Sequence, residues 1–326
     1  MTHIIANPEA FLALKDITIV ITGGAIGIGR EVAIEAHRTE TVSFLIPFPS
    51  VADIWSQILS GPAGHGANVV IGDVAVEAGE SLQKSLDSRC VFVRCNTASY
   101  QDQLSLFKKA HNRFGNIHVV IANAAVVGYS DCFDGTDDIE VEPSMREVDI
   151  NLVGVMYTAR IGLHYLKRSG GGDLIMTSSI AGFKETAYLT PYVASKHGVI
   201  GILRGLRINA QEGIRINVVC PWMTRTGMTK GIETGWIERN LPVNEPADVA
   251  RAILICATAN RAHPQKNHQQ VKLPFHGKIV FVGGGEAYEI EDRLQSLEPE
   301  WLGEENSRVL KLGQAYLHNG ETSWAH

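Results

Sequence analysis

The sequence has no uncharged hydrophobic run long enough to cross a membrane. A spanning helix needs about 20 consecutive apolar residues, and no stretch of the 326-residue chain reaches that length without a charge. The first apolar segment is short, and the leader before it, residues 1–8, does not resemble a signal peptide. These absences favour a soluble, cytoplasmic protein with no membrane span.

Cysteine is scarce and scattered. The five residues are Cys90, Cys95, Cys132, Cys220 and Cys256, with no CxxC pair and no Cys/His ligand spacing. An odd, dispersed set is typical of reduced thiols in a cytosolic compartment. The histidine-rich stretch 261–270 also lacks ordered ligand spacing, so we expect a surface loop there and no metal site.

An excess of positive charge is absent as well. Lys and Arg total 29 against 35 Asp and Glu, which gives a formal net charge of -6 and a pI near 6.1. This balance argues against nucleic acid or an anionic membrane as a partner. Hydrophobic residues make up 45% and charged residues 20%, an ordinary globular composition that can bury a core.

Seven short apolar runs alternate with helix-like segments. The runs are 17–22, 69–73, 91–94, 119–122, 173–177, 214–219 and 278–282, and the helix-like segments include 101–114, 145–168 and 192–211. Nearly continuous apolar strands separated by helices are typical of βαβ units. The prediction is an α/β fold: a Rossmann-type, doubly wound, seven-stranded parallel sheet with helices on both faces, forming one domain over 1–326 with a core of about 15–285.

Residues 38–64 do not fit this pattern. They separate the first helix from the strand that ends at Asp73, and they contain an eighth strand-like run, 42–46. Without them, residues 35–37 would continue directly into 65–67. Two accounts remain open: a genuine surface excursion, or translated intron sequence. The tail 286–326 is expected to pack on the body or on a partner subunit.

A glycine-rich turn follows the first strand and opens the first helix. It reads Thr22-Gly23-Gly24-Ala25-Ile26-Gly27-Ile28-Gly29. Glycines allow a tight turn and a close approach of the backbone to a pyrophosphate, whose charge is stabilised at a helix N-terminus. The turn therefore predicts a dinucleotide site, with Thr22, Gly23, Gly27, Ile28 and Gly29 as cofactor-binding residues.

Asp73, at the end of the predicted second strand, is the candidate for binding the adenosine ribose. An acid there accepts hydrogen bonds from the ribose hydroxyls and repels a 2′-phosphate, so NAD is favoured over NADP. If 42–46 were the second strand, its end would be Pro47 and no acid would be present. Arg30, just after the turn, is the one feature that favours NADPH.

Tyr192 and Lys196 are four residues apart and so share one face of a helix. A nearby ammonium and the positive nicotinamide ring are expected to favour tyrosinate and lower the phenol pKa, which makes Tyr192 a usable general acid/base. Ser179 ends the fifth predicted strand, where its hydroxyl can hydrogen-bond a substrate oxygen.

Together these motifs resemble the short-chain dehydrogenase/reductase family. The turn, Asn123-Ala124-Ala125, Asn151, Ser179, Tyr192 and Lys196 occur in the family's order and spacing over about 15–285. The resemblance implies that Tyr192 transfers the proton and that Lys196 binds the nicotinamide ribose and tunes Tyr192. It also implies that Ser179 positions the carbonyl and that Asn151 holds a proton-relay water, although Asn151 could merely be a packing residue.

The sequence departs from the family pattern at several places. The family's Asn-Asn-Ala-Gly reads Ala122-Asn123-Ala124-Ala125, and the Asp that touches adenine is replaced by Asn96. The family's Pro-Gly after the sixth strand reads Pro221-Trp222, and the threonine that reaches the nicotinamide carboxamide corresponds to Thr226. Trp222 is either a wall of the substrate pocket or an ordinary core residue.

The segment 221–224, the pair Gly235-Trp236 and the tail 283–303 resemble a fungal subgroup similar to NAD-dependent hydroxyprostaglandin dehydrogenases, some of which serve secondary metabolism. The resemblance implies an NAD-dependent alcohol dehydrogenase or ketoreductase acting on a hydrophobic small molecule, whose pocket is supplied largely by 222–246. The alternatives are an NADPH-dependent ketoreductase and a non-catalytic dinucleotide-binding scaffold. We expect a homodimer or homotetramer that pairs through the helices 145–168 and 192–211.

Overall fold

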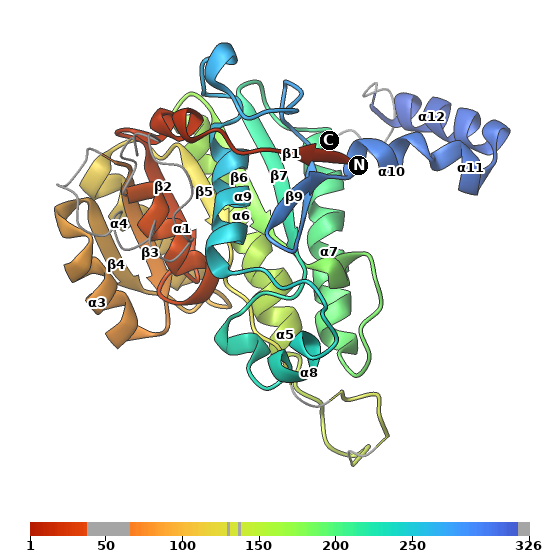
Figure 1. The fold of residues 1–326 in the computed structure, drawn as a ribbon, viewed down its shortest axis with the longest axis horizontal. Helices are drawn as coiled ribbons and strands as arrows, with labels where there is room; N and C mark the ends of the chain where they lie inside the picture. The colour runs from red at the N-terminus through yellow and green to blue at the C-terminus, as the bar shows by residue number, and fades with distance from the viewer. Residues whose placement is uncertain (38–65, 129–130, 136–137, 319–326) are drawn as a thin grey trace.

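The computed structural model describes residues 1–37, 66–128, 131–135 and 138–318 (Figure 1). A sheet of nine strands runs through these residues in the order β1-β9-β8-β7-β6-β5-β2-β3-β4. Its strands are β1 (Thr2–Ile4), β2 (Thr18–Thr22), β3 (Asn68–Asp73), β4 (Cys90–Arg94), β5 (Val119–Ala122), β6 (Gly172–Thr177), β7 (Ile214–Pro221), β8 (Ile279–Gly283) and β9 (Glu286–Glu289).

All seven predicted strands are present as β2 to β8, and all of them pair in parallel. The strand count of seven was wrong, because β9 adds to β8 and β1 adds to β9, both antiparallel. The α/β doubly wound class is confirmed, with a mixed edge on a parallel sheet.

The structure decides which strand follows the first helix. Within the described residues, β3 pairs with β2 in the register Ile19↔Val69 to Thr22↔Gly72, so Asp73 stands at the carboxyl end beside the glycine turn. The competing run 42–46 and the rest of segment 38–64 lie outside the described residues.

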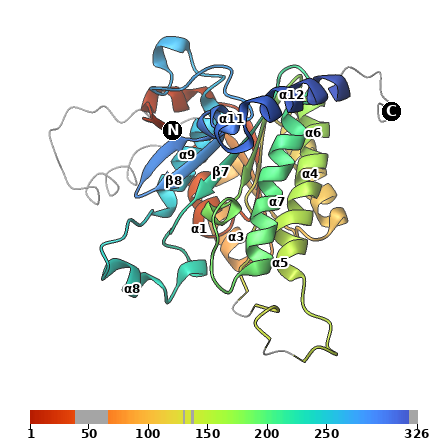
Figure 2. The same cartoon turned by 90° about the vertical axis from the view of Figure 1, so that its right-hand side faces the viewer.

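Helices cover both faces of the sheet (Figures 1 and 2). On one face lie α1 (Gly27–His37), α3 (Val76–Ser85) and α9 (Pro246–Thr258); on the other lie α4 (Tyr100–Phe114), α6 (Gly154–Arg168) and α7 (Thr190–Arg207). Successive strand residues point to opposite faces, so Ile19 and Ile21 join the first core and Val20 joins the second. No described helix could span a membrane.

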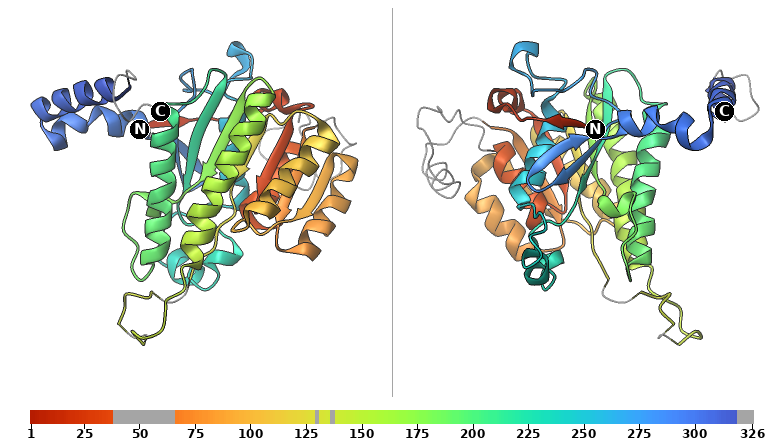
Figure 3. Two further views of the ribbon diagram at one scale, coloured as in Figure 1. Left: turned by 180° about the vertical axis from the view of Figure 1, so that it is seen from behind. Right: turned by 45° about the vertical axis from the view of Figure 1, so that its right-hand side comes forward.

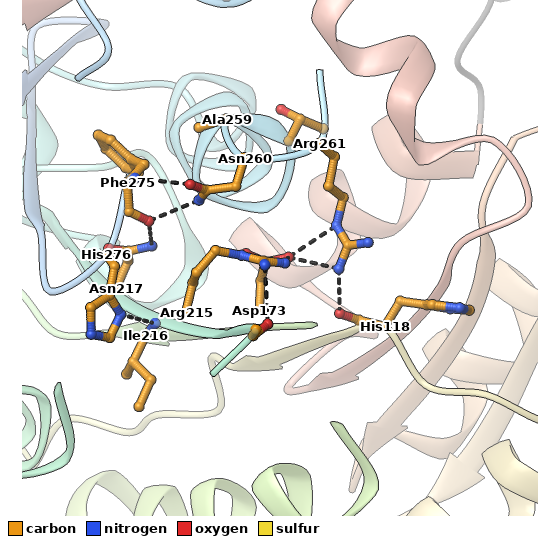
Figure 4. A network of polar contacts seen from close by, with 12 residues as sticks. His118, Asp173, Arg215, Ile216, Asn217, Ala259, Asn260, Arg261, Phe275 and His276 are labelled. Atoms are coloured by element: carbon orange, nitrogen blue, oxygen red, sulfur yellow. Dashed lines mark hydrogen bonds and ion pairs between the residues drawn. The ribbon is translucent and has the colours of Figure 1, made fainter. Parts of the chain in front are cut away.

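A buried charge network fixes the amino-terminal edge of the sheet (Figure 4). Asp173, at the start of β6, is 1% exposed and pairs with Arg215 of β7 and with Arg261 beyond α9, each at 2.7 Å. Arg261 also donates to the His118 carbonyl at 2.9 Å. The network lies at the end of the sheet opposite to the glycine turn, so it stabilises the scaffold without entering the site.

The histidine-rich stretch is less of a surface loop than expected. His268 is 3% exposed, accepts the Asn7 N–H at 3.1 Å and bonds Thr258 at 2.8 Å. Burial lowers the pKa of His268 to about 4. This histidine is a neutral core residue that ties the amino terminus to the end of α9.

The C-terminal tail begins on the body and then leaves it (Figures 1 and 3). After β9, the helix α10 (Glu291–Ser296) is anchored by Glu291, which is 1% exposed and bonds Arg204 and Arg207 of α7 at 3.0 and 2.8 Å. The helices α11 (Glu298–Leu302) and α12 (Glu304–His318) project outward. Within α12 the side chain of Ser307 is the only one that is buried.

Candidate active site

A cavity of about 1610 Å³ opens at the carboxyl edge of the sheet, beside the point where β2 and β5 are neighbours. The chain runs away from this point in both directions, which is where doubly wound sheets bind dinucleotides. Ten of the predicted site residues line the cavity: Gly23, Gly27, Ile28, Asp73, Asn96, Asn123, Ser179, Tyr192, Lys196 and Thr226. The other three predicted site residues do not line the cavity: Thr22, Gly29 and Asn151.

The glycine turn is shaped for close approach. Gly23 and Gly27 have φ values of +68° and +54°, which L side chains rarely adopt. A Cβ on Gly29 would lie 2.0 Å from the Gly23 carbonyl oxygen, so no larger residue fits there. Thr22 accepts the Asn123 N–H at 3.3 Å and so links β2 to the next loop. The backbone at the start of α1 is therefore left open to a pyrophosphate.

Asp73 holds the turn and retains free acceptor capacity. Its two oxygens accept the Ala25 and Ala75 N–H groups, each at 3.0 Å, and the residue is 8% exposed. A carboxylate has about four acceptor sites, so two remain for ribose hydroxyls. Arg30, by contrast, pairs with Glu31 and does not line the cavity. The residues present therefore fit the ribose end of a dinucleotide.

Two further cofactor candidates, Asn96 and Thr226, line the same cavity. Asn96 is exposed at the cavity, and its side-chain oxygen accepts the Ala98 N–H at 3.1 Å. The Thr226 methyl group lies 3.6 Å from the position that a Cβ on Gly27 would take. Thr226 therefore lies against the glycine turn, and both line the cavity.

A chain of polar contacts joins the glycine turn to Lys196. Asn123 donates to the Gly23 carbonyl at 3.0 Å and accepts from the Thr177 hydroxyl at 3.2 Å. The Thr177 carbonyl in turn accepts from Lys196 Nζ at 3.2 Å. These contacts cross β2, β5, β6 and α7, so they fix the geometry between the predicted cofactor and proton-transfer groups.

Lys196 and Tyr192 stand one turn apart on α7, as the spacing predicted. Lys196 Nζ lies 5.5 Å from the centroid of the Tyr192 ring. Lys196 is 2% exposed, and burial lowers its pKa to about 8. Burial raises the pKa of Tyr192, while its hydrogen bond with Ser179 acts in the opposite direction. For the protein alone this direction is opposite to the expected one, because desolvation outweighs the contacts that favour tyrosinate.

Ser179 is oriented by the turn after β6. Its hydroxyl accepts the Ala181 N–H at 3.2 Å and lies 3.5 Å from the Pro221 carbonyl. It also bonds Tyr192. The two hydroxyls therefore converge on one point of the cavity, which is where an alcohol or carbonyl oxygen of a substrate would be bound.

Asn151 lies in a π-helical turn, 149–153, between α5 (Arg146–Val148) and α6. Its side chain is 0% exposed, accepts the Val126 N–H at 2.8 Å and donates to the Val126 carbonyl at 2.8 Å and to Ser195 at 3.3 Å. Such π-bulges are frequent at functional sites. The amide is thus engaged by backbone, and the predicted water-holding role stays a prediction.

An aromatic wall closes one side of the cavity. Trp222 packs edge-on against Trp236 of α8 (Glu233–Ile237), with ring centroids 5.4 Å apart, and lies 6.4 Å from the ring of Phe281. Trp236 Nε1 donates to the Pro242 carbonyl at 2.9 Å, which holds the indole in place. All three rings line the cavity. Of the two interpretations of Trp222, the pocket wall is the one that the structure shows.

Glu147 was not identified from the sequence. It is 8% exposed, and its Oε1 accepts the Gly128 N–H at 2.7 Å. Its position one turn before Asn151 was the available signal, but the partner is a backbone group in an irregular loop, which no residue spacing indicates.

Comparisons with known proteins agree with this geometry. The family model for short chain dehydrogenases matches residues 56–235. The short-chain dehydrogenase/reductase ascJ of Acremonium egyptiacum is 30% identical over 91% of this chain and 96% of its own. The 15-hydroxyprostaglandin dehydrogenase [NAD(+)] of Rattus norvegicus is 31% identical over 52% of this chain and 63% of its own.

A solved short-chain type dehydrogenase/reductase from Mycobacterium marinum shares the fold, with a TM-score of 0.65 and 20% identity over 84% of this chain and 98% of that one. The chain belongs to the short-chain dehydrogenase/reductase family and is an oxidoreductase acting on CH–OH groups. The family match begins at residue 56 and so omits the glycine turn, although the structure places that turn at the cavity.

Proposed function

We propose that this protein interconverts a secondary alcohol and a ketone on a hydrophobic small molecule with NAD, in fungal secondary metabolism. The observation that carries the proposal is the convergence of Ser179, Tyr192 and Lys196 in the cavity that the glycine turn also lines. A non-catalytic scaffold would have no physical need for these three side chains in one cavity.

Each of these residues has a separate role in alcohol oxidation. Tyr192 accepts the hydroxyl proton of the substrate and returns it in the reverse reaction, a contribution of about 10²–10⁴-fold to the rate. Ser179 holds the substrate oxygen beside the phenol. Lys196 supplies the positive charge that favours tyrosinate and, with Asn123 and Thr226, would hold the nicotinamide end of the cofactor. When bound, NAD supplies the hydride acceptor.

The choice of NAD rests on Asp73. Its carboxylate would bind the ribose hydroxyls and repel a 2′-phosphate, while Arg30, the cation that could favour NADP, is paired with Glu31. The name of the rat relative specifies NAD. An NADPH-dependent ketoreductase is the alternative that the experiment below separates.

The aromatic wall supports a hydrophobic substrate. Trp222, Trp236 and Phe281 offer flat apolar surfaces, and such pockets select ligands by shape with few polar contacts. Because the cavity, at about 1610 Å³, exceeds the 300–1,000 Å³ usual for one small ligand, it has room for a dinucleotide and a substrate together. We also propose that the protein is cytoplasmic, in keeping with its five free cysteines. We propose as well that it forms a homo-oligomer.

The test is a panel of secondary alcohols, from cyclohexanol to larger aromatic carbinols, assayed with NAD and with NADP by the absorbance of the reduced nicotinamide. We expect turnover with NAD and a preference for the larger aromatic members. Asp73→Ala should then shift the NAD/NADP preference toward NADP by roughly 1–3 kcal/mol, the usual worth of a charged hydrogen bond. An unchanged ratio would show that Asp73 does not bind the ribose.

A further inference from the structure

Two side chains, one helical turn apart, hold the loop after β5 from behind. Asn151 bonds both the N–H and the carbonyl of Val126, and Glu147 Oε1 accepts the Gly128 N–H at 2.7 Å. Between these anchors, Val126 and Val127 line the cavity. The backbone of 126–128 is therefore fixed by side chains of the α5–α6 helix, and it forms part of the substrate wall.

Glu147 is an unusual residue for this position because it is a carboxylate in a nearly buried place. It is 8% exposed, and among the described residues no Lys, Arg or His forms an ion pair with it. A Cβ on Gly128 would lie 2.9 Å from Glu147 Oε2, so the second oxygen also packs against this loop. Among the described residues one N–H group donates to this carboxylate, and a negative charge at so buried a place would be poorly screened by solvent.

The same carboxylate acts on the catalytic phenol. Helix α5 packs against α7, the helix that carries Tyr192. The charged and titratable groups that act on Tyr192 are Lys196 on its own helix, Cys220 at the end of β7 and Glu147 of α5. Cys220 is a thiol whose pKa is raised by burial to about 12, so it is neutral at working pH. Glu147 is thus the carboxylate among them, and after burial it adds to the raised pKa of Tyr192, whereas the ammonium of Lys196 acts in the opposite direction.

We propose that Glu147 is a positioning residue for the reaction: it holds the 126–128 wall against the substrate and presents a nearly buried carboxylate to the helix that carries Tyr192. The inference rests on the proposed function, because it assigns Glu147 a part in the same proton transfer. Its two effects are separable, since the hydrogen bond to Gly128 needs only an acceptor oxygen whereas the effect on Tyr192 needs the negative charge.

The substitution Glu147→Gln separates them. The Gln side chain retains an acceptor for the Gly128 N–H but removes the charge, so the rising limb of the pH profile for cyclohexanol oxidation with NAD should move to lower pH by about 0.5–1 unit, with KM unchanged. Glu147→Ala should move the limb equally and also raise KM about fivefold, the loss expected for one hydrogen bond. Glu142→Gln, an exposed carboxylate outside the cavity lining, should leave both unchanged.

A second measurement does not depend on the substrate. The tyrosinate absorbance of the NAD-saturated protein is titrated with pH, and the curve of Tyr192→Phe is subtracted to isolate Tyr192. In the Glu147→Gln background the isolated step should lie about 0.5–1 unit lower. Equal affinity for NADH in all variants shows that the fold is intact.

The outcomes distinguish a failure of the proposed function from a failure of the inference about Glu147. If Tyr192→Phe retains turnover, or if the titration contains no step due to Tyr192, the proposed function itself is wrong. If Tyr192→Phe abolishes turnover but Glu147→Gln leaves both the pH limb and the titration step in place, the inference about Glu147 alone is overturned.

Discussion

At the scale of one residue, the burial of the Lys196 ammonium lowers the stability of the folded protein. Its ammonium is 2% exposed, its one described hydrogen bond is to the Thr177 carbonyl, and burial lowers its pKa to about 8 from 10.5. The unfolded chain therefore binds this proton more tightly than the folded chain does. Below pH 8 the folded protein bears the full cost of the buried charge. As pH rises from about 8 to 10.5 the cost disappears, so this group makes the protein more stable with rising pH.

We expect Lys196→Met to increase the free energy of unfolding at pH 7 by about 1–3 kcal/mol while it weakens NADH binding and turnover. The gain should shrink toward pH 10, where wild-type Lys196 is also neutral. Denaturant titrations at both pH values check this, with the exposed Lys167→Met as the control. A variant less stable than wild type at pH 7 would show that the Thr177 contact outweighs the desolvation.

Residue spacing predicted part of the site and not the rest. The sequence placed Ser179, Tyr192, Lys196, Asp73, Gly23 and Gly27 in one site, and all of them line the cavity, because the predicted roles demand fixed residue types at fixed separations. Glu147 was missed because its partner is a backbone N–H of an irregular loop. The direction of the Tyr192 pKa was also missed, because desolvation depends on packing from several elements and leaves no mark on the local sequence.

At the scale of elements, the parallel strands were predictable and the antiparallel edge was not. The strands β2, β3, β5, β6 and β7 are buried along nearly their whole length and so appear as nearly continuous apolar runs; β4, at the parallel edge, is only partly buried but was recognised from the same kind of run. The strands β1 and β9 have three and four residues and partly exposed side chains. They join opposite ends of the chain, since Thr2 pairs with Glu289. A local sequence pattern does not predict a partner strand so far away along the chain.

The link between α1 and β3 is the element that most invites a test. Its described ends meet: Ala67 donates to the Ala36 carbonyl at 3.0 Å, and a Cβ on Gly66 would lie 1.7 Å from the His37 carbonyl oxygen. Such links usually have 2–6 residues. Since His37 and Gly66 lie side by side, a short link between them requires little movement of α1 or β3.

We propose that the functional protein lacks most of 38–64, as retained intron sequence would imply. A chain with 38–64 deleted should fold better by thermal denaturation and be at least as active as the full chain. Transcripts across the region should include a spliced product joining near His37 and His65. If every transcript retains the segment and deletion abolishes activity, 38–64 is a working part of the enzyme.

At the scale of the whole molecule, the face of α7 that turns away from the sheet is suited to contact with another copy. Gly201 and Gly205 are exposed there, and a Cβ at either position would meet nothing within 4 Å. A flat face lets helices approach closely, and most soluble oligomers are symmetric. These features support the homodimer or homotetramer expected from the sequence.

Gly201→Arg should therefore leave the monomer folded, because the new side chain has open space, but should lower the mass measured by light scattering at micromolar concentration. Ser81→Arg, on the exposed side of α3, is the matched control and should keep the mass of wild type. A wild-type protein that scatters as a clean monomer would contradict the expected assembly.

The central claim is that Tyr192 transfers the proton, and Tyr192→Phe tests it most directly. The change removes one hydroxyl and leaves the ring and the glycine turn in place, so turnover of the best alcohol with NAD should fall by about 10²–10⁴-fold while NADH affinity stays within twofold. Tyr188→Phe, at an exposed tyrosine on the same segment, should leave turnover unchanged. Near-wild-type turnover in Tyr192→Phe would contradict the account.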